Sequence, residues 1–228
     1  VVVTPGDLSP RETKAVTMLV QEVAKRTQIH WQVVTKWPET SGAPIIAVGR
    51  EANLQREFPQ TAPWLKRRAA PAGSEGYRVQ TENGSAVLVA GNDERGVLFG
   101  IGRLLRELRM SRGEIRLPAE FAEASAPQFA LRGHQLGYRP KTNSYDGWDL
   151  DQWEQYYRDL AVFGTNAIEL IPPRSDDAAD SPHFPAAPLD TMIGMSRLAH
   201  EYGLDVWIWY PAMDSDYTDP ATVETALK

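Results

Sequence analysis

The chain contains no cysteine among its 228 residues, so it forms no disulfide and offers no thiolate for catalysis. Without thiolate ligands, a structural zinc site is not expected. No apolar run approaches the roughly 20 residues of a transmembrane helix, so no membrane span is expected. Lys and Arg number 24 against 30 Asp and Glu. Because both signs are interspersed and no basic stripe occurs, no nucleic-acid partner is expected.

The length and the 42% apolar content allow two modest domains, each with its own core. The first is expected over residues 1–124 as a small α+β layer. Ser9 and Glu12 have the spacing of a capping box and predict a helix that begins at Pro10. Asn83-Gly84 lies between two apolar runs and predicts a hairpin. Further elements are predicted as strands over 31–35, 45–48 and 113–117, a helix over 93–109, and a linker over 118–127.

The second domain is expected over residues 125–228 and alternates strands with helices. The predicted order is a strand from Phe129, a helix over 149–163, a strand over 166–171, a helix over 189–202 and a strand over 204–210. This order is typical of a parallel sheet with right-handed crossovers. A closed eight-stranded barrel takes about 250 residues, so the expected fold is α/β, the first three β/α units of a (β/α)8 barrel that is apparently truncated.

Two short motifs carry a resemblance to known enzymes. The segment Gly73–Leu108 contains a hairpin followed by Asp93-Glu94-Arg95-Gly96-Val97-Leu98-Phe99-Gly100, which opens a helix. It resembles the accessory N-terminal domain of family 67 α-glucuronidases and family 20 β-hexosaminidases. The segment Ala126–Tyr138, with Arg132-Gly133, is similar to the first barrel strand of these families.

The resemblance implies a glycoside hydrolase that acts on oligo- or polysaccharides in its full-length form. It implies that Arg132 binds sugar hydroxyls. The catalytic carboxylate pair of these families lies on later strands, so it is expected beyond Lys228, and no catalytic residue is assigned within the chain. Neither a cofactor nor a metal is expected, and the expected location is periplasmic or extracellular.

The candidate saccharide-binding residues follow from strand position, because the carboxyl ends of parallel strands meet at one edge of a sheet. They are Arg132, His134, Gln135, Glu169, Trp209 and Tyr210. Guanidinium and carboxylate groups suit sugar hydroxyls, and an aromatic ring stacks on the apolar face of a pyranose. The loop residues Tyr138, Arg139 and Tyr145 are expected at the rim of this site.

Each candidate has a structural alternative. Arg132 and Glu169 are equally consistent with an ion pair inside the sheet, since buried charge is usually paired. His134 suits a satisfied histidine at a strand end, and the aromatic residues of the third strand suit packing against a helix.

Two other functions stay open at this stage. One is a non-catalytic carbohydrate-binding or assembly module on the same fold. The other is a small complete enzyme with its site at Glu169, Asp214 and Asp216. In either case a three-stranded part of a barrel exposes an apolar edge, which favours homo-oligomers.

Overall fold

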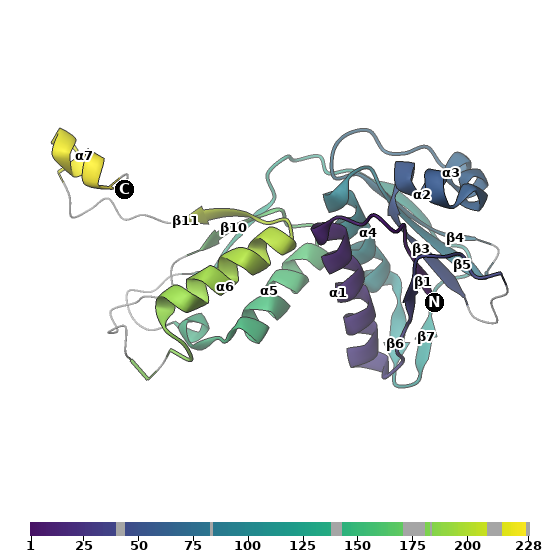
Figure 1. The fold of residues 1–228 in the computed structure, drawn as a ribbon, viewed down its shortest axis with the longest axis horizontal. Coiled ribbons are helices and arrows are strands. Elements are labelled where there is room, and N and C mark those ends of the chain that lie inside the picture. The colour runs from purple at the N-terminus through teal and green to yellow at the C-terminus, as the bar shows by residue number, and fades with distance from the viewer. Residues whose placement is uncertain are drawn as a thin grey trace.

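The computed structural model describes residues 1–39, 44–82, 84–137, 143–170, 181–182, 184–208 and 216–226. Within these residues the strands form a six-stranded sheet, a three-stranded sheet and a two-stranded hairpin. Helices lie between the two larger sheets (Figure 1). The chain therefore builds its two predicted sheet-forming regions side by side.

The six-stranded sheet has the order β2-β1-β3-β5-β4-β8. Its strands are β1 (Val2–Val3), β2 (Val33–Val34), β3 (Ile45–Arg50), β4 (Tyr77–Glu82), β5 (Ala86–Gly91) and β8 (Ala122–Ser125). The strands β2, β1, β3 and β5 are parallel, whereas β4 pairs antiparallel with β5 and with β8. The small α+β layer expected from the sequence is thus a mixed sheet.

Helices cover both faces of this sheet because its strands are apolar on both sides. Ile46 and Val48 of β3 pack toward α1 (Pro10–Thr27) and α4 (Glu94–Glu107). Ile45 and Ala47 of the same strand pack toward α2 (Glu51–Glu57), the 3-10 helix η1 (Pro59–Thr61) and α3 (Ala62–Arg67). The alternation along one strand therefore divides the core into two layers.

The predicted starts of the two long helices are confirmed. Ser9 Oγ accepts a bond from Glu12 N at 3.2 Å, and Glu12 Oε2 accepts one from Ser9 N at 2.9 Å. Asp93 caps α4 by accepting from Gly96 N at 2.8 Å. These bonds satisfy amides that have no partner within the helix, which is why the capping motifs were informative.

Three parts of this region differ from the sequence prediction. Residues 122–125, predicted within a linker, form β8 at the sheet edge. The predicted closing strand near residue 115 is β7 (Glu114–Arg116), which pairs only with β6 (Arg109–Ser111) in a hairpin. No element was predicted over 51–67, where α2, η1 and α3 lie. These elements are short, and short elements show little periodicity.

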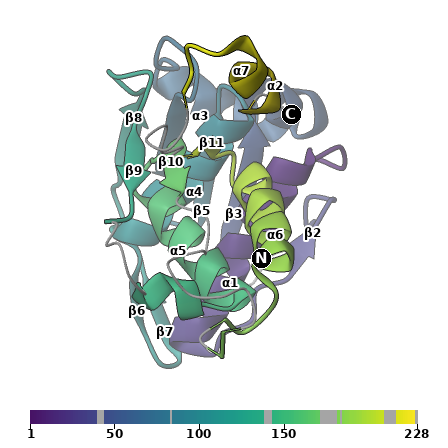
Figure 2. The same cartoon turned by 90° about the vertical axis from the view of Figure 1, so that its left-hand side faces the viewer.

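The predicted parallel sheet is confirmed. It has the order β11-β10-β9, from β9 (Gly133–Gln135), β10 (Ala167–Leu170) and β11 (Asp205–Ile208). Both strand pairs are parallel. The crossovers are α5 (Leu150–Val162) and α6 (Pro188–Glu201), which lie side by side (Figure 2). A short helix, η2 (Ser144–Gly147), precedes α5, and α7 (Pro220–Ala226) follows β11.

Two details of this region correct the prediction. Asp149 and Asp190 stand at the starts of the two predicted helices and are expected to cap them. Asp149 caps α5, accepting from Gln152 N at 2.8 Å, but Asp190 does not cap α6. That helix begins at Pro188 and has no side-chain cap. The apolar sequence Val206–Tyr210 predicts a third strand covered on both faces, yet every residue of β11 is exposed.

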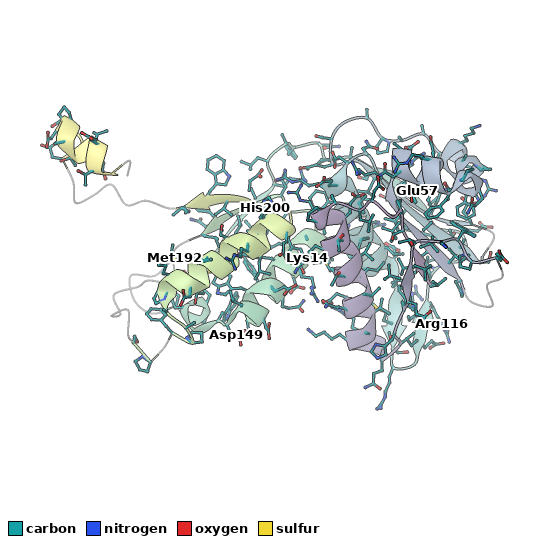
Figure 3. The ribbon with its side chains drawn as sticks, viewed as in Figure 1. Lys14, Glu57, Arg116, Asp149, Met192 and His200 are labelled. Carbon is teal, nitrogen blue, oxygen red and sulfur yellow. The ribbon has the colours of Figure 1, made fainter. Side chains whose placement is uncertain are left out.

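A polar network joins α1 to α5 and α6. Lys14 Nζ, labelled in Figure 3, lies 2.8 Å from a carboxylate oxygen of Glu154 and 2.8 Å from one of Glu201. Deeper in the interface, Arg158 Nη1 lies 2.9 Å from Glu22 Oε1, and its Nε donates to Tyr202 Oη at 3.2 Å. This network and the apolar core together hold the two sheets on one shared helical layer.

Candidate functional site

One row of side chains crosses the face of the three-stranded sheet that is turned away from α5 and α6. The register aligns Gln135 with Glu169, and Glu169 with Trp207. Ile168 and Leu170 are buried in the helix-facing core, so Glu169, between them in sequence, points to the opposite face. This row (Gln135, Glu169 and Trp207) is called the open-face row below.

The open-face row offers three kinds of group to a ligand. An amide, a carboxylate and an indole ring follow one another on adjacent strands. Trp207 is 59% exposed, which is unusual for so large an apolar side chain. Among the described residues, Glu169 has no ion-pair partner. Its carboxylate is therefore available to accept hydrogen bonds from hydroxyl groups, while the indole suits the apolar face of a sugar ring.

His134 lies on the other face, against α5. Its Nδ1 is 2.6 Å from Tyr156 Oη, and the two rings meet edge-on with centroids 5.7 Å apart. Burial raises the pKa of Tyr156, so the phenol keeps its proton while it is hydrogen-bonded to Nδ1. The prediction that His134 and Glu169 lie on one binding face is therefore wrong. Gln135 is aligned with Glu169, and successive side chains of a strand point to opposite faces, so His134 points away from Glu169.

Arg132 lies at the amino end of β9, because the strand begins only at Gly133. The prediction placed it at the carboxyl end. Its Nε donates to the carbonyl of Gly164 at 2.8 Å, and its Nη1 donates to that of Phe129 at 2.8 Å. Its Nη2 forms an ion pair with Glu75, and among the described residues neither Glu169 nor a loop aspartate is its partner. The alternative prediction that Arg132 forms an ion pair is confirmed, but the sequence did not indicate Glu75 as its partner.

Glu75 is the polar residue that sequence reasoning missed. Besides Arg132, its carboxylate contacts Arg95 Nη1 at 3.1 Å and Asn166 Nδ2 at 3.2 Å. It lies in the loop before β4, in a stretch with no motif of its own. The sequence pointed to Glu75 only indirectly, because the arginines of the two Arg-Gly motifs, Arg95 and Arg132, both form ion pairs with it.

The remaining candidates fall in different places. Tyr145, expected at a rim, is buried and donates to the carbonyl of Gly137 at 3.0 Å. Asp216 accepts from Thr218 Oγ1 and, at 2.9 Å, from Thr218 N; these bonds hold its pKa below its usual value. Four candidates and one alternative lie outside the described residues, namely Trp209, Tyr210, Tyr138, Arg139 and Asp214.

The hollows found in the described part of the chain lie away from the open-face row. One, of about 720 Å³, is lined by residues such as Trp31, Ile46 and Leu108 of the first region. Another, of about 490 Å³, lies between α6 and the helix-facing side of β10 and β11, beside Met192, which Figure 3 labels. Gln135, Glu169 and Trp207 line none of these hollows. None of the described helices is long and apolar enough to cross a membrane. In the same residues, no group of three His, Asp or Glu side chains is arranged to hold a metal ion.

No family model matches the sequence, and no curated protein matches it. Solved structures do match. The chain is 19% identical to CpGH84B, a family 84 glycoside hydrolase, with a TM-score of 0.63 over 98% of this chain. It is 16% identical to BtGH115A, a family 115 4-O-methyl-α-glucuronidase, with a TM-score of 0.60 over 90% of this chain. It is 16% identical to the Streptomyces plicatus β-hexosaminidase, with a TM-score of 0.58 over 90% of this chain.

These matches show that the chain has a fold found in glycoside hydrolases, as the sequence motifs predicted. They extend across both sheets, since 90% or more of the chain is aligned in each. The chain spans only 36%, 28% and 40% of the three matched chains, respectively. At this level of identity the likeness concerns the fold alone.

Proposed function

We propose that the chain is the amino-terminal part of a glycoside hydrolase of α-glucuronidase or β-hexosaminidase type. In this proposal residues 1–124 form an accessory domain, and residues 125–228 form the first three β/α units of a (β/α)8 barrel. Two observations support it: the parallel order β9-β10-β11 with intervening helices, and the alignment of nearly the whole chain with such enzymes. The catalytic pair would then lie beyond Lys228.

The observation that carries the proposal is the open-face row. A barrel places the side chains of alternate strand positions inside and near its mouth. In this proposal Gln135, Glu169 and Trp207 take such positions, and the aromatic sequence that contains Trp207 also includes Trp209 and Tyr210. Glycoside cleavage usually needs two carboxyl groups about 5–10 Å apart. Among the described residues of this face, Asp205 is paired with Arg95 and Glu169 has no ion-pair partner. A single unpaired carboxylate suits binding rather than cleavage.

Saccharide binding by the chain tests the proposal. N-acetylglucosamine and glucuronic acid are titrated separately while tryptophan fluorescence and amide NMR shifts are followed. We expect one of them to bind with a Kd on the order of 1 mM, about −4 kcal/mol. Trp207→Ala and Glu169→Gln should each weaken binding by about tenfold, or 1.4 kcal/mol. Val206→Ala, on the same strand but the opposite face, is the matched control and should leave Kd unchanged.

Two outcomes would count against this function. If neither sugar binds, or if Val206→Ala weakens binding as much as Trp207→Ala, the open face is not a saccharide site. If the chain itself hydrolyses nitrophenyl glycosides at an enzymatic rate, the catalytic pair lies within it, as in the small-enzyme alternative. The coding sequence after codon 228 separates the two other functions, the hydrolase and the binding module. Further barrel strands support the hydrolase, whereas a stop codon supports the binding module.

A further inference from the structure

Glu75 lies in a backbone conformation that most residues avoid. Its φ is 60°, in the left-handed region, and only 8% of the residue is exposed. Glycine is the usual residue at such a position, because a Cβ is disfavoured there. A glutamate held in this conformation needs a compensating interaction from its side chain.

The backbone of Glu75 is fastened to the start of α4. Its amide donates to Asp93 Oδ2 at 2.7 Å, while Asp93 Oδ1 caps α4. The neighbouring carbonyl of Gly76 lies so close to Gly96 that a Cβ there would be 2.2 Å from its oxygen. Gly96, the glycine of the first Arg-Gly motif, thus allows the loop before β4 to contact the start of α4. This contact positions the carboxylate of Glu75.

The carboxylate contacts groups from the beginnings of two parallel strands. Arg132 directly precedes β9, and Asn166 directly precedes β10. The two anchors are also bonded to each other, since Asn166 Oδ1 accepts from Arg132 N at 2.8 Å. The guanidinium of Arg132 additionally lies over the ring of Phe99 on α4, 5.3 Å from its centroid.

The third strand is reached through Arg95. This residue of α4 binds Glu75 with Nη1, and its Nη2 lies 2.6 Å from Asp205, the first residue of β11. One carboxylate therefore contacts the amino ends of all three strands, directly or through a single arginine. The strands run away from this point, as the arrow of β11 shows (Figure 1).

We propose that Glu75 is the positioning residue that sets β9, β10 and β11 on α4, and that Arg95 and Arg132 act as its ligands rather than as saccharide ligands. Both guanidiniums are about one-fifth exposed and converge on the same carboxylate. Without its negative charge, two positive groups would face each other with little water to separate them. This proposal does not depend on the saccharide function, because it concerns only how the two sheets are joined.

Amide hydrogen exchange of the whole chain tests the proposal, with Glu75→Gln as the main variant. We expect exchange in β9, β10 and β11 to rise at least tenfold, while exchange in β3 and β5 changes by less than threefold. Glu82→Gln is the matched control. Glu82 is also a buried carboxylate that binds an arginine, Arg67, but it lies within the six-stranded sheet. It should raise exchange in β4 and β5 and spare β9–β11.

A second variant keeps the test decisive if Glu75→Gln does not fold. Asp205 has a 60% exposed side chain, so Asp205→Asn is expected to fold. It cuts only the branch through Arg95 and should raise exchange in β11 about threefold while β9 is unaffected. Unchanged exchange in β9–β11 for Glu75→Gln, or a rise of the same size in both larger sheets, would overturn the proposal. So would an equal rise in β9 and β11 for Asp205→Asn.

Discussion

At the scale of single residues, glycines decide how closely the helices and loops approach. Gly102 lies where α4 crosses α5, and a Cβ there would be 2.8 Å from both the Cα and the carbonyl oxygen of Val162. These are backbone atoms, which cannot move aside as a flexible side chain does. Gly102, two residues after the motif, is therefore a packing position between the two regions, whereas Gly96 and Gly100 of the motif pack within the first region.

Replacing Gly102 tests this role. Gly102→Ala is expected to lower the free energy of unfolding by about 1–3 kcal/mol, because the new methyl group pushes α5 away from α4. Urea denaturation measures it. Gly133→Ala is the control: its Cβ would meet Ala167 at 3.9 Å, an ordinary contact, so we expect a change within about 0.5 kcal/mol. Equal losses in the two variants would show that helix proximity is not the cause.

At the scale of elements, the interface of α1 with α5 and α6 depends on charge. Burial alone would raise the pKa of Glu154, but hydrogen bonds from Lys14 and Tyr202 outweigh it and hold that pKa below the usual 4.5. Burial likewise disfavours the charged form of Lys14, yet its bonds to Glu154 and Glu201 leave its pKa above 10.5. A carboxyl with a depressed pKa stabilises the fold above its unfolded value and loses that effect as pH falls through the folded value.

This linkage predicts an acid-dependent loss. Lys14→Met should destabilise the chain most near pH 6, and the difference from the wild type should shrink as the pH is lowered below 4.5, where Glu154 becomes protonated. Urea denaturation between pH 3 and pH 6 measures the difference. Lys25→Met is the control on the same helix, since Lys25 bonds to the neutral amide of Gln155. A difference for Lys14→Met that stays constant with pH would contradict the mechanism.

The elements also show what the sequence could reveal and what it could not. Helices with caps, such as α1 with Ser9 and α5 with Asp149, were predicted to within a residue or two because the capping bonds are local. The strand β8 was missed because its residues, AEAS, have no apolar alternation and depend on β4 for pairing. Exposure of β11 depends on which other elements cover its two faces, which periodicity does not encode.

The shared position of Gln135 and Glu169 could be predicted for the same local reason. The prediction for Arg132 was wrong because β9 begins later than the sequence suggested. Gln135 and Glu169 share a row because both lie near the ends of aligned strands. Arg132 was misplaced because the apolar residues from Phe129 looked like strand, whereas β9 begins at Gly133. Its partner Glu75 is 57 residues away along the chain, and only the folded structure brings the two together.

At the scale of the whole molecule, the exposed edge of the three-stranded sheet predicts self-association. Ile208 of β11 is 62% exposed, and its strand is hydrogen-bonded on one side only. We expect the chain to form oligomers at micromolar concentration, and Ile208→Lys to shift it toward the monomer, because a charge on an edge strand opposes pairing. Light scattering after size exclusion measures the mass.

An exposed position on the other sheet supplies the control. Val33 lies on β2, also an edge strand, but that strand is only two residues long. Such a short edge offers little to pair with, so Val33→Lys should not change the mass. A wild-type chain that runs as a monodisperse monomer would rule out association through β11.

The polar contacts around Glu75 are all gathered where the three strands start, far from where they finish. Substitutions at the finishing ends of β9, β10 and β11 therefore leave these contacts in place. The anchor that sets the strands on α4 and the surface at their finishing ends can thus vary in sequence independently of each other.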